Sequence, residues 1–172
     1  GIAKMLNFAH GDIIMVGAYV CFWAMQALGC PTIVSIVIAM VVCTVLGMLI
    51  ERLAYKPLRQ ATSLAVLITA IGMSYLLQNI ALLIWGANPK NFTSVVSIGK
   101  LSLFNGKLLI TGEAIVTVLA NIVIMLALTF FTGKTKMGKA MRAVSEDKGA
   151  AELMGINVNA TISLTFAIGS AL

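Results

Sequence analysis

The side chains of this chain that could do chemistry are few and scattered. Its single histidine is His10, so neither an HExxH zinc site nor a second imidazole is available. No two carboxylates fall on one face of an apolar segment, as an intramembrane aspartyl protease would require. Because catalysis needs several titratable groups that converge on one point, the sequence predicts no catalytic residues and no metal ligands.

The tripeptide Gly133-Lys134-Thr135 resembles the end of a phosphate-binding loop. That motif needs a further glycine five positions earlier and a preceding strand, but Leu128 stands there, inside a long apolar segment. We therefore predict that the chain by itself binds neither ATP nor another cofactor.

Polar side chains also interrupt the apolar segments. Gln78, Asn79 and Asn121 are amides in stretches where an unpaired polar group is costly, so they either hydrogen-bond between helices or line a pathway. The polar run from Asn7 to Asp12 precedes an apolar segment and indicates non-helical backbone or a helix start. The membrane tolerates such a segment only against protein or water. Asp12 would complement the dipole of a helix that starts there.

Small residues recur at every fourth position of one apolar segment, at Ser35, Ala39, Cys43 and Gly47. This spacing puts them on one face of a helix and lets another helix approach closely. Tight packing in a bundle and a groove facing a substrate are both compatible with the pattern.

The elements that hold these residues are membrane-spanning. Of the 172 residues, 60% are hydrophobic and 10% are charged, whereas soluble domains have about 25% charged residues. Twelve basic residues against six acidic ones give a net charge of +6, but eight of the basic residues gather in two linkers between apolar stretches. That distribution is typical of the positive-inside rule rather than of a nucleic-acid-binding surface, so we expect lipid and not nucleic acid as a partner.

We predict an all-α membrane protein, a polytopic bundle of transmembrane helices. The charge-free stretch from Ile13 to Ile50 is too long for one span and is broken at Gly29-Cys30-Pro31. The chain starts at Gly1 and stops at Leu172 inside an apolar run, so we expect a single transmembrane domain, 1–172, truncated at both ends. The expected spans are residues 13–28, 32–50, 64–85, 114–132 and 161–172.

The linkers after the second and fourth spans share one side of the membrane and hold eight basic residues, so this side should be cytoplasmic. On the other side, apolar runs flank Asn105-Gly106 and predict a small extracellular β-hairpin on a type I′ turn, with an irregular loop as the alternative. The cytoplasmic loop 133–157 should contain a helix over Glu146–Met154, with Ser145 as N-cap and Gly155 at C′. By its residues alone this loop is either a docking element or a solvated face.

Three motifs, in order along the chain, resemble the branched-chain amino-acid ABC transporter permeases. The first is Asn7-Phe8-Ala9-His10-Gly11-Asp12 with Met15–Tyr19, and it is similar to the permease subunit that carries the NFAHG segment. The second is Glu51–Arg59, in the first cytoplasmic linker. The third is Met137–Asp147, continued by Ala150–Asn157.

The resemblance implies a permease, not an enzyme, that forms the translocation pathway for branched-chain amino acids in a prokaryotic inner membrane. Separate ATP-binding subunits would drive it, a second permease would complete a homo- or heterodimer, and an external or periplasmic binding protein would deliver substrate. An importer of the same type for urea or short amides is an alternative. A secondary transporter is a further one, although it would need intramembrane acids or broken helices at mid-depth.

The resemblance also implies roles for particular residues. Residues of the cytoplasmic coupling loop that docks on the ATPase would be Gly138, Arg142, Ala143, Asp147, Ala150, Ala151 and Gly155. Residues near the translocation pathway would be Asn7, His10 and Gly11, to which the amides add Gln78, Asn79 and Asn121 as candidates.

Overall fold

The computed structural model describes residues 9–59, 61–91, 101–103 and 108–172, and nearly all of this is helical. The chain divides into two compact units. The first unit comprises Gly1–Pro89 and Ala140–Leu172, and the second unit comprises Lys90–Lys139.

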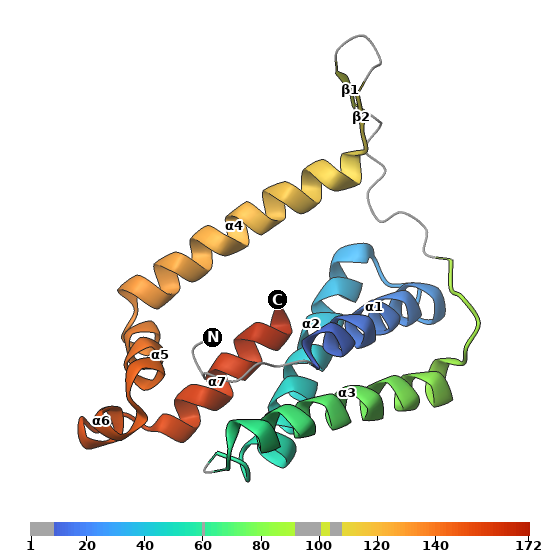
Figure 1. The fold of residues 1–172 in the computed structure, drawn as a ribbon. Helices are drawn as coiled ribbons and strands as arrows, with labels where there is room; N and C mark the ends of the chain where they lie inside the picture. Colours follow the sequence, from blue (N-terminus) through green and yellow to red (C-terminus); the bar gives the residue numbers. More distant parts are fainter. Residues whose placement is uncertain (1–8, 60, 92–100, 104–107) are drawn as a thin grey trace. The chain divides into compact units, whose positions relative to one another are not determined.

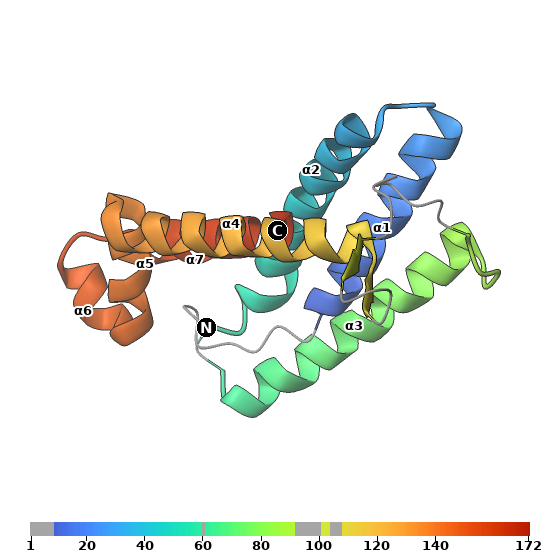
Figure 2. The same cartoon turned by 90° about the horizontal axis from the view of Figure 1, so that it is seen from above.

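The first unit is a packed group of helices, shown in Figures 1 and 2. Its long helices are α1 (His10–Ala27), α2 (Thr32–Ile50), α3 (Ser63–Trp85) and α7 (Val158–Ala171). A π-helical turn, η1 (Glu51–Tyr55), extends α2, and the short helix α6 (Lys148–Leu153) precedes α7. Helix α1 packs against α2 and α3, and α2 also packs against α7.

Helices α1 and α2 form a hairpin whose turn lies where Gly29 and Pro31 predict it. Gly29 has a φ of 60°, a left-handed conformation that costs glycine little, and Pro31 precedes the first residue of α2. Both figures show the two helices side by side, joined by this turn.

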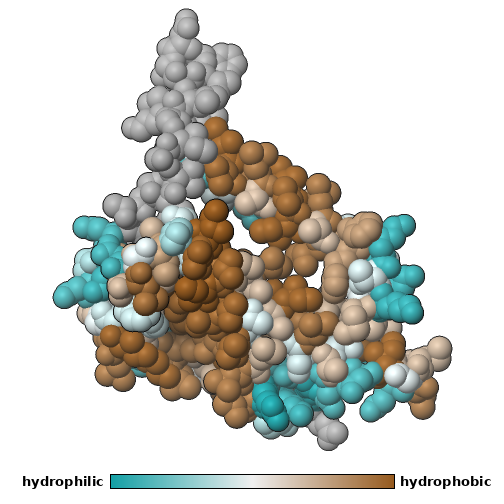
Figure 3. All heavy atoms as spheres, turned by 180° about the vertical axis from the view of Figure 1, so that it is seen from behind, coloured by the Kyte–Doolittle hydropathy of each residue, from teal (hydrophilic) through white to brown (hydrophobic). Residues whose placement is uncertain are grey.

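Within the described residues, three helices are long and apolar enough to cross a membrane: Thr32–Tyr55, Leu64–Trp85 and Gly112–Lys134. Helix α7 is apolar but shorter. Many large apolar side chains of these helices are exposed, and Figure 3 shows them as wide apolar areas on the surface. A water-soluble protein rarely exposes so much apolar surface, whereas lipid tails accept it.

The small residues of α2 form its packing face. Ser35, Ala39, Cys43 and Gly47 are all buried. A Cβ atom added to Gly17 of α1 would lie 2.9 Å from the Cys43 sulfur, and the Cys43 thiol donates to the Ile13 carbonyl at 3.5 Å. The stripe therefore packs helices together, which is one of the two interpretations that the sequence left open.

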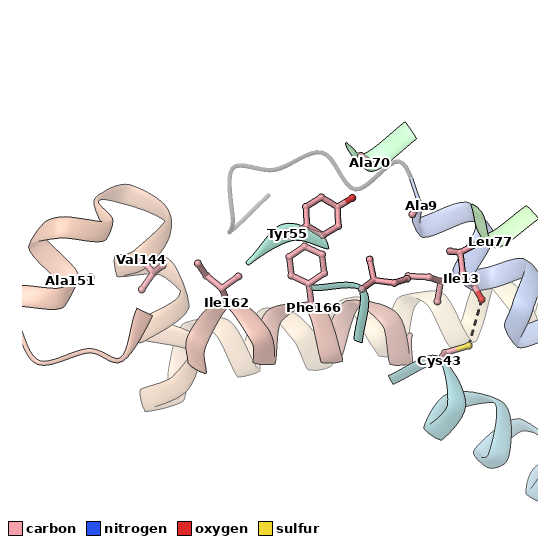
Figure 4. Packing of buried hydrophobic residues seen from close by; sticks show 11 residues of the cluster. Ala9, Ile13, Cys43, Tyr55, Ala70, Leu77, Val144, Ala151, Ile162 and Phe166 are labelled. Atoms are coloured by element: carbon pink, nitrogen blue, oxygen red, sulfur yellow. Dashed lines mark hydrogen bonds between the residues drawn. The ribbon is translucent and has the colours of Figure 1, made fainter. Parts of the chain in front are cut away.

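The buried core of the first unit continues from α1 and α2 to α6, as Figure 4 shows. The rings of Tyr55 and Phe166 lie with their centroids 5.3 Å apart, where η1 meets α7. Val144 and Ala151, which belong to the cytoplasmic loop predicted over residues 133–157, are part of the same cluster. One continuous core thus links that loop to α2.

The second unit contains α4 (Gly112–Lys134), the first residues of α5 (Lys136–Glu146) and two short strands, β1 (Leu101–Leu103) and β2 (Leu108–Ile110). The strands pair antiparallel, with Leu101 opposite Ile110 and Leu103 opposite Leu108. The turn predicted at Asn105-Gly106 lies outside the described residues.

A close contact between α2 and α7 leads to the first prediction. A methyl group added at Gly47 would overlap Oγ and Cβ of Ser170. Gly47→Ala in the full-length protein should therefore lower the free energy of unfolding by about 1–3 kcal/mol, the usual cost of overpacking. The measurement is thermal unfolding in detergent.

Gly72 of α3 is the matched control, because a Cβ there meets nothing within 4 Å. Gly72→Ala should leave stability equal or slightly higher, since alanine is the better helix former. Adding Ser170→Gly to Gly47→Ala should restore much of the loss. Equal unfolding of Gly47→Ala and the wild-type protein would contradict this packing.

Candidate functional site

The chain turns tightly at Thr135, between α4 and α5. The Thr135 hydroxyl donates to the Phe131 carbonyl at 2.6 Å and accepts from the Gly138 amide at 3.0 Å, so one side chain serves the end of α4 and the start of α5. Gly138 is buried, and a Cβ there would overlap backbone atoms of Phe131 and Thr132. Only glycine fits this position without a backbone shift.

The N-terminus of the short helix α6 corrects the expectation from the sequence. Ser145 is not an N-cap: it lies inside α5, and its hydroxyl donates to the Arg142 carbonyl at 2.7 Å. The cap is Asp147, whose Oδ1 accepts from the amides of Gly149 at 2.8 Å and Ala150 at 3.1 Å. The apolar face of α5 buries Met141 and Val144, which keeps the chain helical past Ser145. The helix expected over Glu146–Met154 is therefore the shorter α6.

The C-terminus of α6 matches the expectation. Gly155 has a φ of 79° and follows the C-cap residue, so its predicted C′ position is confirmed. Its amide donates to the Glu152 carbonyl and the Ile156 amide donates to the Ala151 carbonyl, both at 3.0 Å. This pair of hydrogen bonds is the Schellman motif. The Asn157 side chain then caps α7 by accepting from the Ala160 amide at 3.0 Å, so α6 and α7 meet at a defined angle.

The residues assigned to the coupling loop by resemblance divide by exposure. Gly138 and Ala151 are buried and Ala143 is half-buried, whereas the exposed ones are Arg142, Asp147, Ala150 and Gly155. Two further residues were missed: Leu153 is 91% exposed and Met154 is 82% exposed. The sequence feature that could have identified them is an apolar pair directly before a C′ glycine, at the end of a short loop helix.

A buried polar network, centred on an ion pair, joins the C-terminal end of α2 to the start of α7. Glu51 is 1% exposed, and the Arg59 guanidinium pairs with its Oε1. Arg59 also donates to Oδ1 of Asn159, and the Ser163 hydroxyl donates to Oε2 of Glu51 at 2.7 Å. In the sequence, Glu51 is only the first residue of the second family motif, Glu51–Arg59, and nothing there predicts its ion pair. The sequence feature that could have identified Glu51 is its isolation: it is the only acidic residue between Asp12 and Glu113, and it lies at the end of an apolar span.

A second polar cluster joins α1 to α3. The carboxylate of Asp12, 8% exposed, accepts from the Ser74 hydroxyl at Oδ2 and from the Gln78 amide at Oδ1, the latter at 3.0 Å. Gln78 also donates to the Ser74 hydroxyl at 3.2 Å. For Gln78 the structure thus supports hydrogen bonding between helices. Asp12 is the centre of the cluster, although its place at the start of an apolar segment predicts only a helix-dipole role.

The other pathway candidates do not gather at one point. His10 and Gly11 are exposed in the first turn of α1, next to Asp12. Asn79 donates to the Tyr75 carbonyl of its own helix at 2.7 Å. Asn121 is exposed on α4, in the second unit. Asn7 lies outside the described residues.

Metal chemistry finds no support in the described part of the chain, where no group of three or more His, Cys, Asp or Glu side chains could hold an ion. Cys21, Cys30 and Cys43 are free thiols. Both polar clusters are held by hydrogen bonds, and the Glu51 cluster also contains an ion pair.

The three apolar helices of membrane-spanning length within the described residues define a polytopic helical membrane protein. The chain belongs to the family described as branched-chain amino acid transport system / permease component, whose model matches residues 1–172. No solved structure matches the chain significantly.

Curated relatives agree with this family. The chain is 39% identical over 184 aligned positions to the high-affinity branched-chain amino acid transport system permease protein LivH of Escherichia coli, and 37% identical to BraD of Pseudomonas aeruginosa. Each alignment takes in all of this chain and 59% of the relative. A probable branched-chain amino acid transport permease protein LivH of Methanocaldococcus jannaschii is 31% identical over 96% of this chain and 53% of its own length.

The buried Glu51–Arg59 pair gives the second prediction. Arg59→Ala leaves a buried carboxylate without its cation, and breaking a buried pair in this way costs about 3–5 kcal/mol of stability. Thermal unfolding of the full-length protein measures the loss. Arg52→Ala is the matched control, because Arg52 belongs to the same turn and is exposed; its effect should stay within about 0.5 kcal/mol. Equal losses for the two variants would contradict the role of the pair.

Proposed function

We propose that this chain forms part of the membrane-spanning subunit of an ABC importer that moves branched-chain amino acids across a prokaryotic inner membrane. ATP is bound and hydrolysed by separate subunits, a second permease subunit completes the pathway, and an external binding protein delivers the substrate. The chain spans 59% of the length of the curated LivH and BraD relatives, so this proposal concerns the whole permease rather than the described piece alone.

The structural observation that carries the proposal is the exposed apolar end of the helix α6. It is a short helix, capped at both ends, whose tip exposes Leu153 and Met154 between apolar segments. Exposed apolar side chains on a rigid helix, with basic residues in the preceding α5, are typical of a helix that seats in a cleft of a soluble partner. An ATP-binding subunit is that partner.

The packing of the first unit supports a transmission route. Helix α6 packs on α7, and α7 packs on α2 through Gly47, Phe166 and the Glu51–Arg59 network. We infer that closure of the ATP-binding subunits displaces α6, and that α7 and α2 follow because close packing gives them little freedom to slide. Such coupled helix shifts interconvert inward- and outward-facing states.

Transport by the reconstituted importer tests the function. Proteoliposomes should contain the full-length permease, its permease partner and the ATP-binding subunits, with the external binding protein supplied outside. We expect ATP-dependent uptake of leucine and of its branched-chain analogues. Uptake of urea or a short amide without leucine uptake would overturn the substrate assignment, and uptake without ATP would overturn the importer class.

The tip of α6 gives the third prediction. Leu153→Asp should lower leucine-stimulated ATP hydrolysis at least about tenfold, because it would bury an unpaired charge in an apolar contact. Glu152→Gln on the same helix is the matched control and should change the rate less than about twofold. Since Leu153 is 91% exposed, neither substitution should change the thermal unfolding of the isolated permease. Unaltered coupling in Leu153→Asp would contradict docking through this tip.

A further inference from the structure

Asp12 occupies an unusual position for a carboxylate. It is 8% exposed, its two hydrogen-bond donors Ser74 and Gln78 are neutral, and no ion pair with it occurs among the described residues. A buried charge is stable only when it is paired and hydrogen-bonded. Ser74 and Gln78 supply hydrogen bonds, and the first turn of α1 supplies a partial positive charge, but none of the described residues supplies a full opposite charge.

The cluster lies opposite the middle of α3. Ser74 is about 15 Å along the helix from either end of Leu64–Trp85, a helix long enough to cross the hydrocarbon layer, and Asp12 reaches it from the first turn of α1. The neighbouring Tyr75, Gln78 and Asn79 are exposed on the surface of the first unit. Polar side chains inside the hydrocarbon layer almost always face other protein or a water-filled cavity.

We propose that Asp12, held by Ser74 and Gln78, binds the positively charged α-ammonium group of the transported amino acid as it crosses the membrane. This inference rests on the proposed function and deepens it, because it names the chemical group that the pathway recognises. An ammonium group has three donors, and a carboxylate oxygen that already accepts one hydrogen bond can accept a second. The resulting charge-assisted hydrogen bond is among the strong ones, and it neutralises the buried charge.

The neighbours of Asp12 fit this role. Ser74 and Gln78 hold the two carboxylate oxygens from one side, which fixes the orientation of the group between α1 and α3. Close to Asp12, the Gln78 side chain and the residues His10 and Gly11 are exposed on the surface of the first unit. A neutral solute such as urea lacks the positive charge that this site requires.

Ligand-dependent thermal stabilisation of the full-length importer complex, without the external binding protein, tests the site directly. A ligand that binds only the folded protein raises its unfolding temperature. Leucine and isoamylamine, which has the ammonium group but no carboxylate, should both stabilise the wild-type complex. Ketoisocaproate, which has the leucine side chain and carboxylate but no ammonium group, should not. Equal stabilisation by ketoisocaproate, or none by leucine, would overturn the site.

Three variants separate binding from packing. Asp12→Asn removes the charge and keeps the shape; it should abolish the stabilisation by leucine and lower leucine uptake at least about tenfold, a loss of about 1.4 kcal/mol. Asp12→Glu, which restores the charge, should recover part of both. Ser74→Ala removes one hydrogen bond to the carboxylate but leaves the charge, so it should weaken the stabilisation by leucine only in part. If Asp12→Asn behaves like Ser74→Ala, Asp12 is only a packing residue and the inference is wrong.

The failure of this inference differs from the failure of the proposed function. If the wild-type importer takes up no leucine in proteoliposomes, the proposed function is wrong, and the inference about Asp12 falls with it. If the wild-type importer takes up leucine and Asp12→Asn takes it up equally well, the function stands and the Asp12 site is refuted.

Discussion

The small-residue face of α2 is the constraint on which the first unit depends. At Cys43 it meets Gly17 and Ile13 of α1, and at Gly47 it meets Ser170 of α7. Lipid tails are as apolar as the side chains, so burial of apolar surface drives helix association weakly in a membrane, and close van der Waals contact must supply much of the attraction. Larger residues on this face would hold α1 and α7 away from α2.

Close packing also lets the buried polar groups find partners. With α7 against α2, the hydroxyl of Ser163 reaches Glu51, 112 residues earlier in the chain, and Arg59 bridges Glu51 and Asn159. With α3 against α1, Ser74 and Gln78 reach Asp12. The two clusters differ in charge: Glu51 has its cation within the chain, while the donors to Asp12 are neutral. The first therefore serves as a joint between helices, and the second is suited to an incoming cation.

Local features of the molecule could be predicted from short stretches of sequence. The turn at Gly29–Pro31, the C′ position of Gly155 and the packing face of α2 each follow from a few neighbouring residues. The N-cap of α6 was misplaced, because Ser145 and Asp147 are both good capping residues two positions apart. Only the burial of the α5 face decides that the first helix runs past Ser145. Local signals of equal strength cannot settle such a choice.

The sequence by itself determined that this is a membrane protein of apolar helices and, through its motifs, which permease family it resembles. The tertiary structure decided which polar residues act together. Asp12 and Gln78 are 66 residues apart, and nothing in either local pattern says that they meet. Their partnership depends on how α1 and α3 are rotated about their axes, which only the packing of complete helices fixes. Exposure of Leu153 and burial of Ala151 on the same short helix were decided in the same way.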